Sequence, residues 1–328
     1  MRYCVSLAAA VLATGVVQAA PAVVVGPYKH LTQHRQAGDV ITIAPGGKPV
    51  AYVAADGRPA TLTWAFANGE CGEETWDDRS GQAVADANVK AFAGAGIGYI
   101  VSTGGQGGVF TCATDAGMER FIGRYESPKL VGVDFDIEEH QTDAQIRALA
   151  ERIVVAQRKR PRLRFSFTVA THAASDGSGT SLNPTAQRVL AAVRAAGVTD
   201  YVLNLMTMDY GAASSKVCVL RGARCDMGAS ALQAARNVHE KYGVPYRQIE
   251  VTPMIGVNDV VENVFTVDDA VTVANGVREL GLAGLHYWSL DRDVPCAKPV
   301  GGAQAQCSTM PDVPTGAYGR AFAGAIRR

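Results

Sequence analysis

The sequence has 328 residues, of which 48% are hydrophobic and 19% are charged. This length allows one large α/β domain or two small ones. The 31 basic residues balance the 31 acidic ones, which excludes the strongly basic surface of a nucleic-acid-binding or anionic-membrane-binding protein, so we expect neither partner.

The first segment, residues 1–19, reads as a secretory signal peptide with an early Arg, an apolar run and small residues before Ala19. The alternative is a retained membrane anchor. The apolar run is short for a transmembrane helix, and no other segment reaches the roughly 20 apolar residues that such a helix needs. We therefore expect a secreted or periplasmic protein whose mature domain covers residues 20–328.

Eight apolar or alternating runs then recur along the chain with helical segments between several of them. The expected strands are 22–26, 61–66, 97–103, 129–137, 164–170, 201–207, 249–255 and 283–289. Amphipathic helices are expected at 142–160, 183–197, 230–243 and 267–281, and a last helix at 316–328. Thr142 and Gln145 form a capping box at the start of the first of these.

This alternation predicts an α/β fold, a (β/α)8 TIM barrel in a single domain, with the active site at the carboxyl ends of the strands. A doubly wound open sheet is the alternative. The absence of a GxGxxG turn after the first strand weakens that alternative.

The fourth expected strand carries three acids on one face, Asp134, Asp136 and Glu138, because side chains alternate along a strand. Neighbouring carboxylates and apolar walls raise a carboxyl pKa, which suits a group that donates a proton near neutral pH. Two alternatives stay open, a site for a hard cation and acids satisfied by internal hydrogen bonds. We expect no metal and no cofactor.

Further candidates lie at the carboxyl ends of other strands. Asp209 and Tyr210 end the sixth strand, and Trp288 on the eighth offers a flat apolar face for a sugar ring. We expect Gly104 and Gly105, at the end of the third strand, to allow close backbone approach rather than to bind phosphate.

The expected mature chain has six cysteines, and an even number in an exported protein predicts disulfides. Cys218–Cys225 and Cys296–Cys307 would each close a short loop, which leaves Cys71–Cys112. Free buried thiols are the alternative, and no cysteine spacing indicates zinc.

The motif GVDFDIE (132–138) resembles the DGxDxDxE signature of family 18 glycoside hydrolases, the chitinases and their relatives. IVSTGG resembles the SxGG segment of the third strand, NLMTMDYG the MxYD region of the sixth, and YWSLDRD the Trp-containing eighth. Together with AFANGECGEETW and TPMIGVND, these motifs are most similar to the bacterial chitinase D-like branch.

The resemblance implies retaining hydrolysis in which the substrate's own acetamido group is the nucleophile, an exception to the two-carboxylate scheme. Glu138 would protonate the glycosidic oxygen, Asp136 would orient the acetamido group, and Asp134 would tune Asp136. Trp288 would form the floor of the sugar site, and Met206 and Asp209 would help to line it.

The chain departs from the family pattern at two positions. Val131 stands where the long signature begins with Asp, and Met208 stands where MxYD has its Tyr. Tyr210, two residues further on, is the candidate to supply that hydroxyl. Met208, Tyr28 and Phe66 complete the candidate substrate-binding residues.

The resemblance therefore predicts a secreted, monomeric, endo-acting chitinase whose substrate is chitin or chito-oligosaccharides. The interval 256–282 is too short for the insertion domain that deepens some family clefts, so we expect a shallow, open groove. Two alternatives share the barrel: an endo-β-N-acetylglucosaminidase that acts on N-glycans, and a chitin-binding lectin without catalysis.

Overall fold

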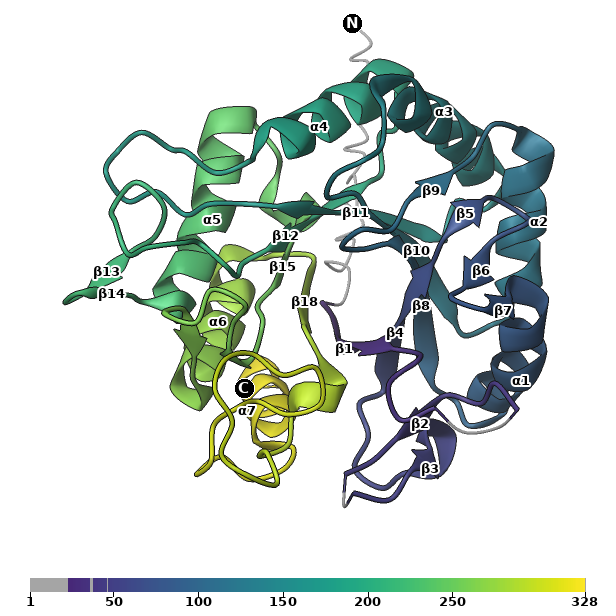
Figure 1. The fold of residues 1–328 in the computed structure, drawn as a ribbon. Helices are drawn as coiled ribbons and strands as arrows, with labels where there is room; N and C mark the ends of the chain where they lie inside the picture. The colour runs from purple at the N-terminus through teal and green to yellow at the C-terminus, as the bar shows by residue number, and fades with distance from the viewer. Residues whose placement is uncertain (1–22, 36–37, 46, 328) are drawn as a thin grey trace, which may run out of the picture.

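The computed structural model describes residues 23–35, 38–45 and 47–327. Its centre is a closed barrel of eight parallel strands (Figure 1), joined in the order β1-β18-β15-β12-β11-β10-β8-β4. The barrel strands are β1 (Val24–His30), β4 (Thr61–Ala67), β8 (Gly98–Gly104), β10 (Leu130–Asp136), β11 (Arg164–Ala170), β12 (Val202–Met206), β15 (Ile249–Thr252) and β18 (Gly284–Tyr287). The predicted (β/α)8 barrel is confirmed, and the open doubly wound sheet is excluded.

Helices surround the barrel (Figure 1). They are α1 (Gly81–Gly94), α2 (Asp115–Tyr125), α3 (Asp143–Lys159), α4 (Pro184–Ala196), α5 (Met227–Tyr242), α6 (Val267–Leu280) and α7 (Ala317–Ile326). The first six connect successive barrel strands from β4 to β18, and α7 packs against α6.

Short strand pairs and 3-10 helices decorate the loops. The small strands are β2 (Thr42–Ile43), β3 (Val50–Ala51), β5 (Gly69–Glu70), β6 (Thr75–Trp76), β7 (Arg79–Ser80), β9 (Phe110–Thr111), β13 (Leu220–Arg221), β14 (Arg224–Cys225), β16 (Gly256–Val257) and β17 (Val264–Phe265). The 3-10 helices are η1 (Tyr52–Ala54), η2 (Tyr246–Gln248) and η3 (Leu290–Arg292). In the described part of the interval between β1 and β4, these small elements stand in place of an outer α-helix.

The predicted strands all form, with changes at their ends. The largest change is at β1, which was expected to end at Gly26 but continues to His30. The strand continues because residues 28–30 pair with residues 63–65 of β4. The charge of Lys29 is accommodated there by a buried partner, Asp291, at 3.0 Å. Tyr28 therefore lies within the first strand rather than at its end.

Five helices were predicted, and the capping box at the start of α3 is present. The helices α1 and α2 were not predicted. The interval between β15 and β18 holds only β16, β17 and α6, so the expected absence of an insertion domain is confirmed there. The predicted signal peptide, residues 1–19, lies outside the described residues, and no helix among the described ones is long and apolar enough to cross a membrane.

Candidate active site

Two of the three predicted acids lie on β10, and the third follows it. Asp134 and Asp136 are 1% and 4% exposed inside the barrel, and Glu138 stands two residues beyond the strand end, half-buried. The alternate residue Phe135 points the other way and packs with its ring 5.6 Å from that of Phe167 on β11. The predicted alternation of acid and apolar faces is therefore present.

The Asp134 carboxylate accepts four hydrogen bonds from hydroxyl groups inside the barrel. Ser102 and Tyr28 donate to Oδ2 at 2.7 and 2.9 Å, and Ser166 and Thr168 donate to Oδ1 at 2.7 and 2.8 Å. Burial raises the pKa of Asp134, while these hydroxyls act to lower it. Asp134 is thus a fully satisfied buried acid beneath the site.

Tyr28 joins this acid to the far side of the barrel. Its hydroxyl oxygen accepts a hydrogen bond from the Asn204 amide at 2.9 Å, and the Asn204 carbonyl accepts one from Thr252 at 2.8 Å. The network runs through the interior from β10 and β1 to β12 and β15. Tyr28 was predicted as a sugar contact, and the structure shows that its hydroxyl is committed to Asp134.

Asp136 lies above Asp134 and keeps one oxygen free. Its Oδ1 is buried and has no hydrogen-bond partner among the described residues. Burial raises its pKa well above the usual range, and the charges of Glu138 and Asp134 add to this shift. A protonated or shared carboxyl at this position could hold a donor that arrives with a ligand.

Glu138 has a pKa of about 7, raised first by burial and then by the charges of Glu139, Asp209 and Asp259. The sequence interpretation attributed this shift to the line of acids on one strand together with apolar walls. Burial is the larger cause, and the neighbouring charges that add to it come from the following residue and from two loops across the rim. The Glu138 carboxyl can therefore carry a proton near neutral pH.

The two glycines at the end of β8 allow that strand to approach the site closely. A Cβ on Gly104 would lie 2.1 Å from the backbone oxygen of Asp136, and one on Gly105 would lie 2.7 Å from the Phe66 ring. Both residues have positive φ, +82° and +80°. The expected close backbone approach is confirmed.

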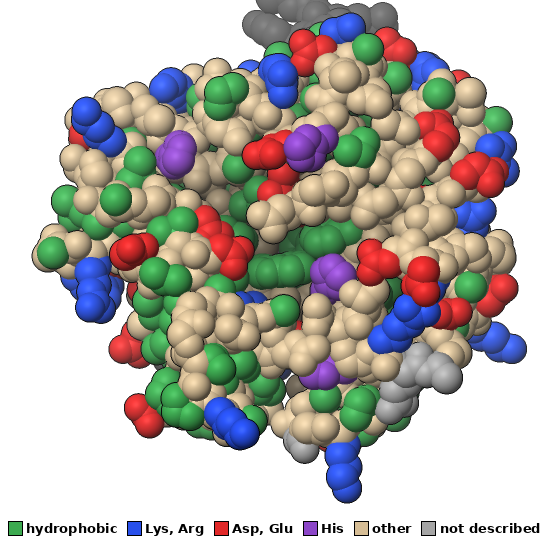
Figure 2. Space-filling model, viewed as in Figure 1, with side chains coloured by type: hydrophobic (Ala, Val, Ile, Leu, Met, Phe, Trp, Pro, Cys, Tyr) green, Lys and Arg blue, Asp and Glu red, His purple; other side chains and the backbone are tan. Residues whose placement is uncertain are grey.

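An aromatic platform lies beside the acids. The rings of Phe66 and Trp288 stack with centroids 5.6 Å apart and planes 22° apart, and both side chains are partly exposed. The rings of Tyr28 and His30 lie 6.2–6.3 Å from each of them. Figure 2 shows hydrophobic side chains at the base of a central hollow, with carboxylates on its edge. Such a surface suits the apolar face of a sugar ring.

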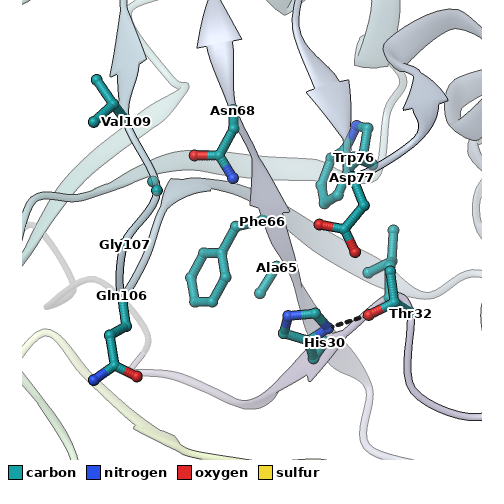
Figure 3. A pocket seen from close by; sticks show the side chains of 13 residues that line it. His30, Thr32, Ala65, Phe66, Asn68, Trp76, Asp77, Gln106, Gly107 and Val109 are labelled. Carbon is teal, nitrogen blue, oxygen red and sulfur yellow. Dashed lines mark hydrogen bonds between the residues drawn. The ribbon is translucent and has the colours of Figure 1, made fainter.

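A pocket of about 370 Å³ lies beside Phe66 (Figure 3). His30, Asn68 and Asp77 line it, and the His30 Nδ1 lies 2.7 Å from the Thr32 hydroxyl. The Asn68 Oδ1 is buried without a hydrogen-bonding partner in the described structure. These polar residues were not predicted, although Asn68 lies in the quoted AFANGECGEETW segment.

Asp209 is locked into the loop that follows β12. Its Oδ1 accepts a hydrogen bond from the Val260 amide at 2.8 Å, and its own amide donates to the Asn258 side chain at 3.3 Å. Burial raises its pKa. The charge of Asp209 in turn helps to raise the pKa of Glu138, so both acids act at the same rim.

The other candidates of the sixth strand differ in burial. Met206 and Met208 are partly exposed, whereas Tyr210 is 2% exposed. Burial raises the pKa of the Tyr210 hydroxyl, while the Thr207 hydroxyl acts to lower it. Its role as a substitute for the missing tyrosine stays a prediction.

Three disulfides are present, with the predicted pairings. They are Cys71–Cys112, Cys218–Cys225 and Cys296–Cys307. Among the described residues, the cluster of side chains close enough to hold a metal is Glu70 with Cys71 and Cys112. Because those two cysteines are bonded to each other, the cluster offers no thiolate ligand.

No protein-family model matches the sequence. Two curated proteins are similar to it: a probable bifunctional chitinase/lysozyme of Escherichia coli K12, 30% identical over 63% of this chain and 24% of its own length, and Endochitinase 11 of Metarhizium anisopliae, 30% identical over 64% of this chain and 42% of its own. The chain thus spans less than half the length of either relative.

Solved structures share the fold. The catalytic domain of a hyperthermophilic chitinase from Pyrococcus furiosus aligns with a TM-score of 0.71 and 24% identity, covering 94% of this chain and 96% of that one. Catalytic-site mutants of active domain 2 of a thermostable chitinase from Pyrococcus furiosus, complexed with chito-oligosaccharides, align with a TM-score of 0.71, 23% identity and coverage of 94% and 95%. The predicted resemblance to chitinases is confirmed in sequence by the two curated relatives, and the solved structures share the fold; the D-like branch is not tested.

Proposed function

We propose that this protein is a secreted chitinase that hydrolyses internal β-1,4 bonds between N-acetylglucosamine units, with retention of configuration. The observation that carries the proposal is Glu138. Its half-buried carboxyl has a pKa of about 7 and lies beyond Asp136 on the rim of the barrel. A carboxylic acid that keeps its proton near neutral pH is what glycosidic bond cleavage needs.

Cleavage begins when Glu138 gives its proton to the glycosidic oxygen, so that the bond from this oxygen to C1 breaks. The carbonyl oxygen of the sugar's own 2-acetamido group forms a bond to C1 and yields an oxazolinium ion. Water then adds to C1, Glu138 takes its proton back from that water, and the acetamido group is restored. Two displacements at C1 retain the configuration.

Asp136 is suited to orient the acetamido group. Its unpartnered Oδ1 can accept the acetamido N–H, which strengthens the carbonyl oxygen as a nucleophile. Asp134 beneath it is held by four hydroxyl groups and supports whichever of the two acids carries the shared proton. These contacts explain why the two carboxyls lie on one buried strand.

The stacked Phe66 and Trp288 rings offer the floor of the sugar site. The pocket beside Phe66, with His30, Asn68 and Asp77 in its lining, continues the hollow and offers hydrogen-bond partners to an adjoining sugar. Because the chain between β15 and β18 carries no insertion domain, we expect an open groove and endo-type cleavage.

Export is supported by the three disulfides, which persist in oxidising compartments. We expect a monomer. Gel filtration with light scattering at several protein concentrations would measure the mass, and a concentration-independent dimer would contradict this expectation.

The test is to incubate the protein and its Glu138→Gln variant with N-acetyl-chitohexaose and to identify the products and the initial anomer by NMR. We expect shorter β-anomeric oligomers, and a loss of activity of about 10²–10⁴-fold in the variant. The Glu139→Gln variant is the matched control, because Glu139 is an exposed neighbour, and it should remain active.

Other outcomes would assign other functions. Binding of the oligomer without any cleavage by the unmodified protein would favour a lectin. Cleavage of N-glycopeptides but not of chito-oligosaccharides would favour an endo-β-N-acetylglucosaminidase.

A further inference from the structure

Three consecutive charged residues follow the aromatic platform, and all three are buried. Asp291, Arg292 and Asp293 come directly after Trp288, Ser289 and Leu290, and they are 5%, 1% and 4% exposed. Charged side chains are rarely buried unless they are paired. Each of the three should therefore have a partner that justifies its burial.

Arg292 and Asp293 anchor the turn on the side of the last strands. The Arg292 guanidinium donates to the Ile255 carbonyl at 3.1 and 3.2 Å, in the loop after β15. The Asp293 carboxylate accepts hydrogen bonds from the backbone amides of Tyr318 and Gly319 at 3.1 and 2.8 Å, in the first turn of α7. These two residues join the turn to its neighbours in the outer part of the fold.

Asp291 reaches in a different direction, to the first strand of the barrel. Its Oδ2 lies 3.0 Å from the Nζ of Lys29, which is 0% exposed. The same Nζ donates to the backbone carbonyls of His30 at 2.7 Å and Gln33 at 2.8 Å. All three ammonium donors are thus used, and the pair connects the end of β1 to the turn after β18.

The end of β1 and the segment that follows β18 carry aromatic residues that face each other. His30 follows Lys29 directly, Trp288 precedes Asp291 by three positions, and the two rings lie 6.2 Å apart at 79°. Of the three tryptophans, Trp64 and Trp76 are 0% and 1% exposed, whereas Trp288 is partly exposed. The Lys29–Asp291 pair is thus the closer ionic connection between the two sides of the platform, since the partly exposed His34 Nε2 lies 3.7 Å from the Asp291 Oδ1.

We propose that Lys29 and Asp291 are positioning residues that hold Trp288 against the first strand, so that the platform is already formed when a chito-oligosaccharide binds. The sugar part of this inference rests on the proposed function. A platform fixed in advance lowers the entropy cost of binding, because the ring need not be immobilised by the ligand.

The test uses Asp291→Asn, Lys29→Met and the double variant. Removal of one partner leaves a buried charge alone and can prevent folding, whereas the double variant removes both charges. The accessibility of the Trp288 ring is measured in the absence of sugar, by acrylamide quenching of tryptophan fluorescence. Binding of N-acetyl-chitotetraose is then measured by titration in the Glu138→Gln background, so that no hydrolysis occurs.

We expect the Stern–Volmer quenching constant to roughly double in each folded variant as Trp288 loosens. We expect the Kd for the tetraose to rise about tenfold, and in otherwise unmodified enzyme KM to rise while kcat changes by less than about threefold. Glu250→Gln is the matched control: Glu250 is a 1% exposed acid paired with Arg164 and His286. Its loss should lower Tm but change neither quenching nor Kd.

Unchanged quenching and Kd in the double variant, with a lowered Tm as in the control, would overturn the inference, because the pair would then be merely structural. If quenching rises but the Glu138→Gln parent binds no tetraose, the positioning of Trp288 stands and the proposed function fails. The two ideas can therefore be separated.

Discussion

The hydroxyl of Tyr28 on β1 donates a hydrogen bond of 2.9 Å to the carboxylate of Asp134 on β10, across the interior of the barrel. This contact connects the first strand to the acidic strand from beneath Asp136 and Glu138, the proposed catalytic residues. It makes Tyr28 part of the electrostatic support of the site, and it can be tested separately from any contact that the ring makes with sugar.

Tyr28→Phe should reduce kcat for chito-oligosaccharides roughly tenfold, since a hydrogen bond to a charged group contributes about 1.5–3 kcal/mol. The loss of one donor also raises the pKa of Asp134 further, because its hydroxyl partners act to lower it. Ser166→Ala removes another donor to the same carboxylate and should act in the same direction. Full activity in both variants would exclude this role.

The pH dependence of kcat/KM should be set on its alkaline side by Glu138. Because this acid must be protonated to act, kcat/KM should fall tenfold per pH unit above about pH 7. Asp259→Asn removes one of the charges that raise the Glu138 pKa, so this limb should move to lower pH by about half a unit. Asp200→Asn, an exposed change just before the start of β12 and so at the other end of the barrel strands, is the control. If Asp259→Asn does not shift the alkaline side of the profile, the assignment of that side to Glu138 is contradicted.

The raised pKa of Glu138 should also destabilise the fold at alkaline pH. Between the ordinary pKa of 4.5 and about 7, the folded protein binds more protons than the unfolded chain, so the free energy of unfolding falls as pH rises. Glu138→Gln removes this penalty. Its Tm should exceed that of the unmodified protein at pH 8 and match it at pH 4, as measured by calorimetry. An equal difference at both pH values would show that another effect of the substitution dominates.

The three disulfides should differ in their contribution to stability. In the chain-entropy description, closing loops with sequence separations of 41, 11 and 7 contributes about 4, 3 and 2 kcal/mol. Paired Cys→Ser changes should therefore lower the free energy of unfolding most for Cys71–Cys112 and least for Cys218–Cys225. Urea denaturation of the three double variants measures this order, and a reversed order would refute it.

Much of the barrel could be predicted from the sequence, because buried parallel strands leave near-continuous apolar runs such as that of β12. The helices α1 and α2 were missed. Helix α1 is rich in Ala and Gly, which weakens its apolar stripe. Helix α2 was missed although it has an apolar face and an N-cap at Thr114, since it is short and contains two glycines. Their formation depends on packing against the barrel, which the local sequence does not reveal.

The acids of the site could also be predicted, because alternation along one strand is a local property. The charges that act on Glu138 could not, since Asp209 and Asp259 lie in separate loops that only the closed barrel brings together. The pocket beside Phe66 combines residues of four loops, and the Lys29–Asp291 pair joins opposite ends of the chain. Contacts of this kind depend on topology and leave no local pattern.

The pairing of β1 with β18 has a consequence for the folding of this chain. It joins residues 24–27 to residues 284–287, so the barrel closes only after residue 287 has been synthesised. Such long-range pairing makes folding slow, because much chain entropy is lost before the contact forms. A growing chain that ends before β18 contains all three acids of the β10 region but neither Trp288 nor the partner of Lys29. The nascent polypeptide therefore cannot bind its ligand in the complete site until β18 and the turn that follows it have been synthesised.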